Sequence, residues 1–293
     1  MKRSLLVFLI AVLLLPATAL PGRATEKVEK PVVHFGVIPR YNPMVMYRNY
    51  QPIMDYLSEH TPFRFELKLS RSYADAIRML REGQTQVASL GDVTFAEAFR
   101  EFGVIPLVKP LNNLGEAFYQ SIIIVRQDSP IQTLEDLKGH TFAFGNIHST
   151  SGNLIPRHYL FRRGISLFDL ESFENLDTHD KVVKAVLKGK VAAGAVKDVV
   201  AYQYQFHGLR FLANIGPIPS VPIVVRHDTP PAVVEALRTA LLAINRKSPE
   251  QIKEMRGWDP EFRNGFTEAQ TSDYRIIFEM LDSIDEGCGA RCH

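Results

Sequence analysis

The sequence has few cysteines, little tryptophan and no excess of charge of one sign. Of its 293 residues only two are cysteine and one is tryptophan. Lysine and arginine number 34 against 32 acidic residues, so the charge balance does not favour binding to a nucleic acid or an anionic membrane. With 46% hydrophobic and 23% charged residues, the composition excludes a mainly disordered chain and is typical of a folded protein of about two domains.

The chain also lacks the sequence patterns of several catalytic and metal sites. It has no glycine-rich phosphate loop with lysine, no His-Glu-x-x-His helix and no cysteine–histidine spacing typical of zinc. Ser149 or Ser151 with His179 and Asp198 could be written as a hydrolytic triad, but no Gly-x-Ser-x-Gly elbow surrounds either serine. We therefore predict a protein that is not an enzyme and that needs no cofactor.

The first 24 residues have the pattern of a secretory signal peptide. Lys2 and Arg3 precede a nearly unbroken apolar run over residues 4–15, and small residues follow. Cleavage fits after Ala19 or after Ala24, and an uncleaved anchor is the alternative. No cysteine follows the run, so a lipid anchor is not supported and we expect a periplasmic protein. Removal of the segment lowers the formal net charge from +2 to −1.

Both cysteines lie in a short tail over residues 286–293. Cys288 and Cys292 are separated by three residues, and His293 ends the chain. In an oxidising compartment this spacing favours a small disulfide loop. Covalent haem attachment is an alternative, although its usual signature has two residues between the cysteines. Metal binding and a disulfide to another chain are also open.

Short apolar segments typical of buried strands alternate with amphipathic segments typical of helices. This βαβ rhythm predicts an α/β fold with a mainly parallel sheet. The expected strands are residues 32–38, 63–69, 87–90, 104–108, 141–145 and 191–195, and the expected helices are 44–59, 73–81, 95–102, 134–137, 153–163, 181–188, 198–206 and 233–244.

A local repeat suggests how the two domains are connected. Residues 123–130 resemble residues 223–230, each an apolar strand that enters a polar turn before a helix. If both are crossover strands, the first lobe contains residues 31–125 and 222–285, and the second lobe is an insertion over 126–221. The two crossovers would form a two-strand hinge. The alternative is coincidence in a common pattern.

Three consecutive hydroxyl residues precede a predicted helix. Ser149, Thr150 and Ser151 follow the strand that ends at Gly145, and Pro156 suits the first helical turn. A helix start has unpaired N–H groups and the positive end of the helix dipole, and hydroxyl groups add uncharged donors. This combination predicts a site for a small oxyanion such as a phosphoryl group. Simple capping of the helix by one hydroxyl is the alternative.

A set of short segments recurs in an order and spacing typical of a known family. The segments are Phe35–Pro39, Tyr50–Pro52, Asp55–Leu57, Ser72–Tyr73, Gly83, Ala88–Gly91, Tyr119–Ser121, Leu134–Gly139, Ser149–Gly152, His179–Asp180 and Gly189. Taken in order, they resemble the phosphate, phosphite and phosphonate periplasmic binding proteins of ABC transporters. The resemblance extends over roughly residues 32–280.

The resemblance implies a type II periplasmic-binding-protein fold, in which two α/β lobes joined by two strands hold the ligand between them. It implies that residues 149–151 bind phosphoryl oxygens and that Tyr73, Tyr119 and His179 complete the site. His179 could donate a hydrogen bond and add charge near neutral pH. Asp198 matches a position that faces a ligand amine in aminophosphonate binders. Each residue also has a purely structural alternative. Tyr73 and Tyr119 could be core residues, His179 could simply lie at a helix N-terminus, and Asp198 could cap the next helix.

One departure from the family pattern leaves the exact ligand open. Phe95 stands near a position where many members have tyrosine, and Asp92 lies beside the expected cleft. A buried carboxylate repels a dianion unless it meets a proton or an ammonium group, although Asp92 could equally be solvated. We therefore predict only the class of ligand, a phosphorus oxyanion or a phosphonate.

The predicted function is capture of this ligand by hinge closure and its delivery to a permease in the inner membrane. We expect a monomer. The alternative with the same fold is a ligand-sensing subunit for a membrane kinase.

Overall fold

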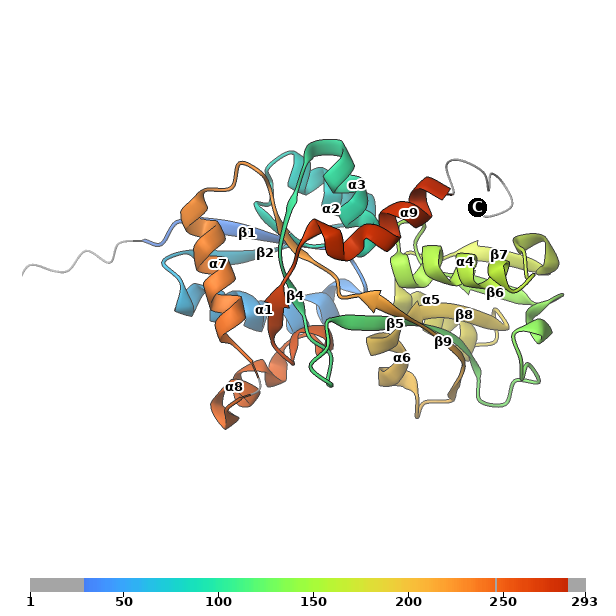
Figure 1. Cartoon of the computed structure of the whole chain (residues 1–293). Coiled ribbons are helices and arrows are strands. Elements are labelled where there is room, and N and C mark those ends of the chain that lie inside the picture. Colours follow the sequence, from blue (N-terminus) through green and yellow to red (C-terminus); the bar gives the residue numbers. More distant parts are fainter. Residues whose placement is uncertain (1–28, 246, 284–293) are drawn as a thin grey trace, which may run out of the picture.

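A computed structural model of the protein describes residues 29–245 and 247–283. Two α/β lobes lie side by side, and the chain crosses between them twice (Figure 1). The predicted signal peptide and the tail with Cys288 and Cys292 lie outside the described residues, so both remain predictions. Within the described ranges, no helix combines the length and the apolar character needed to cross a membrane.

Lobe 1 has a six-stranded sheet in the order β11-β4-β10-β3-β1-β2. Strand β1 pairs in parallel with β2 and β3, whereas β10 lies antiparallel between β3 and β4. The strands are β1 (Val32–Val37), β2 (Arg64–Leu69), β3 (Val87–Ser89), β4 (Ile105–Pro110), β10 (Ile223–Val225) and β11 (Phe266–Glu268). The helices are α1 (Pro43–His60), α2 (Tyr73–Arg81), α3 (Asp92–Phe102), α7 (Pro231–Ala243), α8 (Pro249–Glu254) and α9 (Arg275–Ser283).

Lobe 2 has a five-stranded sheet in the order β7-β6-β8-β5-β9. Here β6 pairs in parallel with β7 and β8, and β5 lies antiparallel between β8 and β9. The strands are β5 (Phe118–Arg126), β6 (Thr141–Phe144), β7 (Ser172–Asn175), β8 (Ala193–Lys197) and β9 (Leu209–Pro219), and the helices are α4 (Ile155–Arg162), α5 (His179–Leu187) and α6 (Asp198–Tyr204). The antiparallel strands β10 and β5 therefore take the same position in the two sheets, and lobe 1 has a further antiparallel strand, β11, at its edge.

The structure places the first crossover earlier than the sequence suggested. Strand β5 belongs to the sheet of lobe 2, because it pairs with β8 and β9 along its whole length. The connecting segments are residues 111–117, before β5, and residues 220–222, before β10. The local repeat has a structural counterpart, because β5 and β10 are the matching antiparallel strands of the two sheets. Each is followed by a turn in which an arginine pairs with an aspartate, Arg126 with Asp128 and Arg226 with Asp228.

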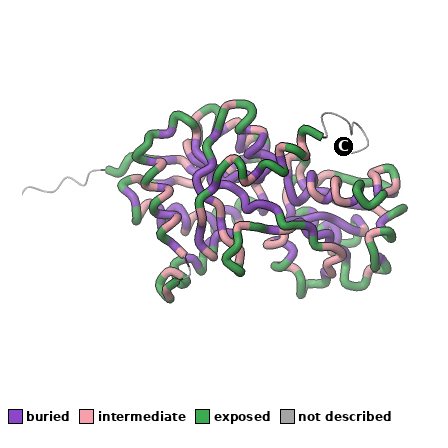
Figure 2. Tube along the Cα trace, in the orientation of Figure 1, coloured by how far each residue is buried: buried purple, intermediate pink, exposed green. Residues whose placement is uncertain are grey.

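Most of the expected elements are present with shifted ends, and the buried residues lie along both sheets (Figure 2). Polar caps begin several helices, as Asn42 and Ser72 accept hydrogen bonds from backbone N–H groups of α1 and α2. The largest change concerns the predicted helix over 153–163. A wide turn over Thr150–Leu154 precedes α4, so the helical segment begins at the hydroxyl residues themselves.

Candidate functional site

A small cavity lies between the two lobes, and both lobes and the second crossover segment contribute to its wall. The centres of water-sized molecules can occupy about 20 Å³ of it, so the cavity is narrow. None of the described residues that line it is acidic. They are Ile38, Arg40, Tyr73, Ser89, Leu90 and Gly91 from lobe 1, Ser149, Thr150, Ser151, His179 and Lys197 from lobe 2, and Tyr119 and Val221 beside the crossovers.

The three hydroxyl residues begin the helical segment at the cavity and are each 3% exposed. The Ser149 side chain caps this segment by accepting a hydrogen bond from the Gly152 N–H at 3.0 Å. This confirms the capping alternative for one hydroxyl. Thr150 and Ser151 are not needed for that cap, and they line the cavity together with Ser149. The N–H groups of a first helical turn have no partner within the helix, so they add donors beside these hydroxyls.

Two glycines allow the hydroxyl residues to approach the end of β6. A Cβ atom on Gly145 would lie 3.0 Å from the Gly152 Cα atom, and the Gly145 N–H donates to the Gly152 carbonyl at 2.7 Å. A Cβ atom on Gly152 would lie 3.0 Å from His179 Cε1. Larger residues at either position would separate the strand end from the helix start.

Tyr73 is the first residue of α2 and is 2% exposed. Burial raises the pKa of its hydroxyl to about 12, with a hydrogen bond to Ser149 acting in the opposite direction. The hydroxyl is therefore protonated at neutral pH and can donate. Through Ser149, lobe 1 thus contacts the hydroxyl residues of lobe 2.

His179 begins α5, whose cap is the neighbouring Thr178. Its Nδ1 atom accepts a hydrogen bond from the Lys197 N–H at 3.3 Å, which leaves Nε2 as the protonated donor. Burial lowers the pKa of the imidazole to about 3, and the charges of Lys197 and Arg40 lower it further. The sequence suggested that His179 could add charge, but the structure makes it a neutral donor.

The positive charge of the cavity comes from two residues that sequence reasoning missed. Arg40 and Lys197 are 3% and 2% exposed. Arg40 lies just after β1 and forms ion pairs with Asp259 and Glu261, and its Nε atom has no hydrogen-bond partner among the described residues. Their positions in the sequence could have indicated a role in binding. Ligands of α/β proteins bind at the carboxyl ends of strands, and strands β1 and β8 end at or just before these two residues.

Lys197 ends β8 and meets residues of both lobes. Its Nζ atom lies 2.7 Å from Glu261 Oε1 of lobe 1 and 3.1 Å from the centre of the Tyr119 ring. Burial lowers the pKa of the ammonium group to about 7, although Asp198 and Asp92 favour its charged form. An anion in the cavity would favour the charged form further.

Asp92 is fully buried rather than solvated, at 0% exposed, and does not line the cavity. Its Oδ2 atom accepts a hydrogen bond of 2.7 Å from the Tyr119 hydroxyl. Burial raises the pKa of Asp92 to about 7, despite the opposing charge of Lys197. A pKa of about 7 lets Asp92 hold a proton close to neutral pH, and the charge of Lys197 favours its ionised form. A proton or a nearby cation is what lets a buried carboxylate tolerate a dianion. The Tyr119 hydroxyl donates to Asp92, and the Tyr119 ring faces the Lys197 ammonium group.

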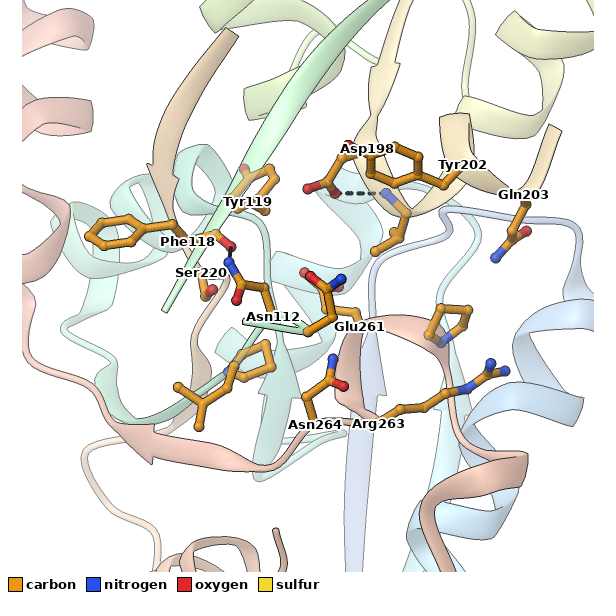
Figure 3. A pocket seen from close by; sticks show the side chains of 15 residues that line it. Asn112, Phe118, Tyr119, Asp198, Tyr202, Gln203, Ser220, Glu261, Arg263 and Asn264 are labelled. Atoms are coloured by element: carbon orange, nitrogen blue, oxygen red, sulfur yellow. Dashed lines mark hydrogen bonds between the residues drawn. The ribbon is translucent and has the colours of Figure 1, made fainter. Parts of the chain in front are cut away.

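Asp198 belongs to a different, open pocket of about 370 Å³ beside the crossovers (Figure 3). Its Oδ2 atom accepts from the Gln120 N–H at 2.9 Å, and its Oδ1 atom accepts from the Val199 N–H at 2.7 Å. This pocket is larger than the enclosed cavity, yet the buried cations line only the cavity. We therefore place the candidate site in the cavity, with Asp198 outside its wall.

Phe95 also lies outside the cavity. It is fully buried in lobe 1, where its ring centre is 4.8 Å from that of Tyr274. The Tyr274 hydroxyl donates to the Ser220 carbonyl at 2.9 Å, next to the second crossover. The absence of a tyrosine at position 95 thus leaves a packed aromatic pair near the crossover rather than a gap in the cavity wall.

Several contacts join the lobes around the cavity. The Val93 N–H of lobe 1 donates to Thr150 Oγ1 at 3.0 Å, and His148 Nδ1 lies 2.7 Å from Glu97 Oε1. An apolar cluster also spans the lobes, with Val93, Leu154 and Ile277 among its members. The structure is therefore closed around the cavity.

Comparison with known proteins identifies the family. The family model for the periplasmic substrate-binding protein of phosphonate ABC transporters matches residues 35–274. The chain belongs to this family. Its members are substrate-binding proteins of ABC transporters and not enzymes, in agreement with the sequence analysis. The fold is of the type II periplasmic-binding-protein class, as the sequence predicted.

Individual relatives agree with this assignment. The chain is 26% identical over 267 residues to the phosphonates-binding periplasmic protein of Escherichia coli strain K12, covering 87% of this chain and 76% of the relative. A binding protein component of an ABC phosphonate transporter from Pseudomonas aeruginosa has a TM-score of 0.80 at 21% identity, with 89% and 90% of the two chains covered. PhnD1 from Prochlorococcus marinus in complex with methylphosphonate has a TM-score of 0.78 at 18% identity, with 88% and 100% covered.

The geometry of this family member disagrees with a hydrolytic triad. The Nδ1 atom of His179 accepts from a backbone N–H, and both oxygens of Asp198 accept from backbone N–H groups. A triad needs the aspartate to orient the histidine. Family membership likewise supports transport and not the alternative of a sensing subunit.

Proposed function

We propose that this substrate-binding protein holds a small phosphorus oxyanion or phosphonate in the enclosed cavity between its lobes. Ser149, Thr150 and Ser151 would bind the phosphoryl oxygens, with Tyr73 and the neutral His179 as further donors. Arg40 and Lys197 would balance the charge of the anion.

The observation that carries this proposal is the composition of the cavity wall. Two buried cations and five side-chain donors converge there from both lobes, and no acidic residue is part of the described wall. The two cations are held by ion pairs with Asp259 and Glu261, which do not line the cavity. Arg40 Nε has no hydrogen-bond partner among the described residues, and an anion in the cavity would supply an acceptor for it. The wall therefore favours a small and strongly anionic group.

We propose that ligand binding favours the closed form. A ligand that contacts both lobes binds that form more tightly and shifts the population towards it. The contacts between Thr150 and Val93 and between Lys197 and Glu261 would form at closure, since their partners lie on opposite lobes. The closed protein would then present the ligand to a permease in the inner membrane.

Calorimetric titration of the purified protein with methylphosphonate, phosphite, phosphate and sulfate tests the ligand class. We expect at least one of the three phosphorus compounds to bind in the micromolar range or tighter, with sulfate weaker. Ser151→Ala should weaken binding by roughly tenfold or more, since a hydrogen bond to a charged group contributes about 1.5–3 kcal/mol. Ser172→Ala, at an exposed position of β7, is the matched control. Absence of binding to all three compounds would refute the proposal.

The predicted export and oligomeric state can be tested on the same preparation. The mass of the protein recovered from the periplasm would identify cleavage after Ala19 or Ala24. Size-exclusion chromatography with light scattering should give the mass of a monomer. A dimer, or a protein that keeps residues 1–24, would contradict the corresponding prediction.

A further inference from the structure

The surroundings of the Lys197 ammonium group have the features of a binding site for a cation. The group lies 3.1 Å from the centre of the Tyr119 ring and 2.7 Å from Glu261 Oε1. The side chains of Lys197 and Glu261 are 3% and 5% exposed. Proteins bind ammonium ligands with aromatic faces and carboxylates arranged in this way.

This position adjoins the proposed oxyanion site. Lys197 and Tyr119 line the same cavity as the three hydroxyl residues, and the Lys197 backbone N–H donates to His179. Glu261 also lines the open pocket, together with Asp198 and Asn264 (Figure 3). The ion pair between Lys197 and Glu261 therefore separates the enclosed cavity from the open pocket.

We propose that Lys197 fills, with its own ammonium group, the cation position next to the oxyanion site. The cavity then accepts phosphorus oxyanions and phosphonates with an uncharged substituent and rejects aminophosphonates. Lys197 is thus a specificity-determining residue. The inference rests on the proposed function, because it concerns the substituent of a ligand whose phosphoryl group is held by residues 149–151.

The carboxylates nearest the ammonium group each have a partner within the protein. Asp92 Oδ1 has no hydrogen-bond partner among the described residues, but Asp92 lies outside the cavity wall. Glu261 pairs with Arg40 and Lys197. Asp92 accepts from Tyr119, and Asp198 accepts from two backbone N–H groups. A ligand ammonium group would lose its hydration and meet two fixed positive charges in the cavity wall.

The Lys197 ammonium also suits an anionic ligand energetically. Burial lowers its pKa to about 7, so the charged form is costly in the protein without a ligand. A phosphoryl anion in the same cavity would offset this cost, whereas an aminophosphonate would add a further positive charge to it. The same residue therefore favours one class of ligand and disfavours the other.

Two ligands of matched size and different charge test the inference. Propylphosphonate and 2-aminoethylphosphonate have the same number of non-hydrogen atoms, and only the second carries an ammonium group. Dissociation constants for both, and for methylphosphonate, would be measured by calorimetry for the wild type and Lys197→Ala. Lys184→Ala, which removes an ion pair of α5 outside the cavity, is the control.

We expect the wild type to bind methylphosphonate and to show no measurable binding of 2-aminoethylphosphonate. In Lys197→Ala the emptied position should accept the ligand amine beside Glu261 and Tyr119. The variant should therefore bind 2-aminoethylphosphonate at least roughly tenfold more tightly than propylphosphonate, as expected from one restored charge interaction. The Lys184→Ala control should behave as the wild type does.

Other results would separate the two proposals. Wild-type protein that binds methylphosphonate and 2-aminoethylphosphonate equally well would overturn this inference and leave the proposed function intact. Binding of no phosphorus compound at all would overturn both. If Lys197→Ala does not fold, Lys197→Met keeps the volume and removes the charge. An unchanged preference between the two matched ligands in that variant would refute the role of Lys197.

Discussion

Substitution of Gly152 by alanine tests whether the close approach of three chain segments creates the anion site. The added Cβ atom would lie 2.9 Å from Ser149 Oγ, 3.0 Å from Gly145 Cα and 3.0 Å from His179 Cε1. Gly145 Cα is a backbone atom at a strand end, so it cannot rotate away. The contact therefore has to push the helix start away from the strand or from His179.

The expected size of the effect follows from this crowding. Overpacking of a filled site costs about 1–3 kcal/mol of the free energy of unfolding, which lowers the melting temperature by several degrees. The effect on the free energy of binding should be of similar size. Loss of one hydrogen bond to a charged ligand costs about 1.5–3 kcal/mol, which raises the dissociation constant for methylphosphonate roughly 10- to 100-fold.

Calorimetric titration and thermal unfolding without ligand would measure the two effects separately. Gly257→Ala is the matched control, because the nearest neighbour of its Cβ atom would be Pro52 Cγ at an ordinary 3.8 Å. The control should bind as the wild type does. A Gly152→Ala protein that is folded and binds methylphosphonate with an unchanged dissociation constant would refute the placement of the oxyanion site at residues 149–151.

Three further predictions follow from the buried titratable groups and from closure. Because the folded-state pKa of Asp92 is about 7 against an ordinary 3.8, the folded protein holds a proton that the unfolded chain has lost. The stabilisation from that proton is lost as the pH rises through 7. Denaturant titrations should therefore show that the free energy of unfolding of Asp92→Asn, relative to wild type, increases between pH 4.5 and 7.5. A difference that stays constant over this range would contradict the prediction. The pKa of His179, about 3, predicts that NMR titration shows a neutral imidazole down to pH 5, and a midpoint near 6.5 would be incompatible with the burial described. Glu97→Gln removes the partly exposed pair with His148 across the lobes and should weaken methylphosphonate binding only about two- to fivefold, as a pair of that exposure contributes about 0.2–1 kcal/mol.

The fold was largely accessible from the pattern of apolar residues. Alternating apolar and amphipathic segments identified the elements up to β4, and the hydroxyl-rich start of the second-lobe helix was recognisable as a capped end. Strand β9 was missed because Leu209–Pro219 mixes polar and apolar residues and contains Gly216 and Pro217. The first crossover was placed too late, because an apolar strand does not reveal which sheet it joins. Pairing of β5 with β8 and β9 decides that point.

The site was accessible in part. Residues 149–151, Tyr73, Tyr119 and His179 come together at one cavity, whereas Asp92 and Asp198 lie outside its wall. The binding role of each remains a prediction. For Asp92, sequence reasoning identified the right question, whether a carboxylate near a dianion is protonated or paired. The answer depends on its burial and on its distance to Tyr119 and Lys197, which the linear sequence does not contain.

By itself, the sequence determined the strands and helices up to β4 and the three hydroxyl residues at a helix start, because these depend on neighbours along the chain. Only the tertiary structure decided the charge of the cavity. Arg40 and Glu261 are far apart in the sequence and pair within lobe 1, and Lys197 of lobe 2 pairs with Glu261 across the lobes. Whether Lys197 is charged and His179 neutral depends on burial and on charges from distant segments, which act through space and not along the chain.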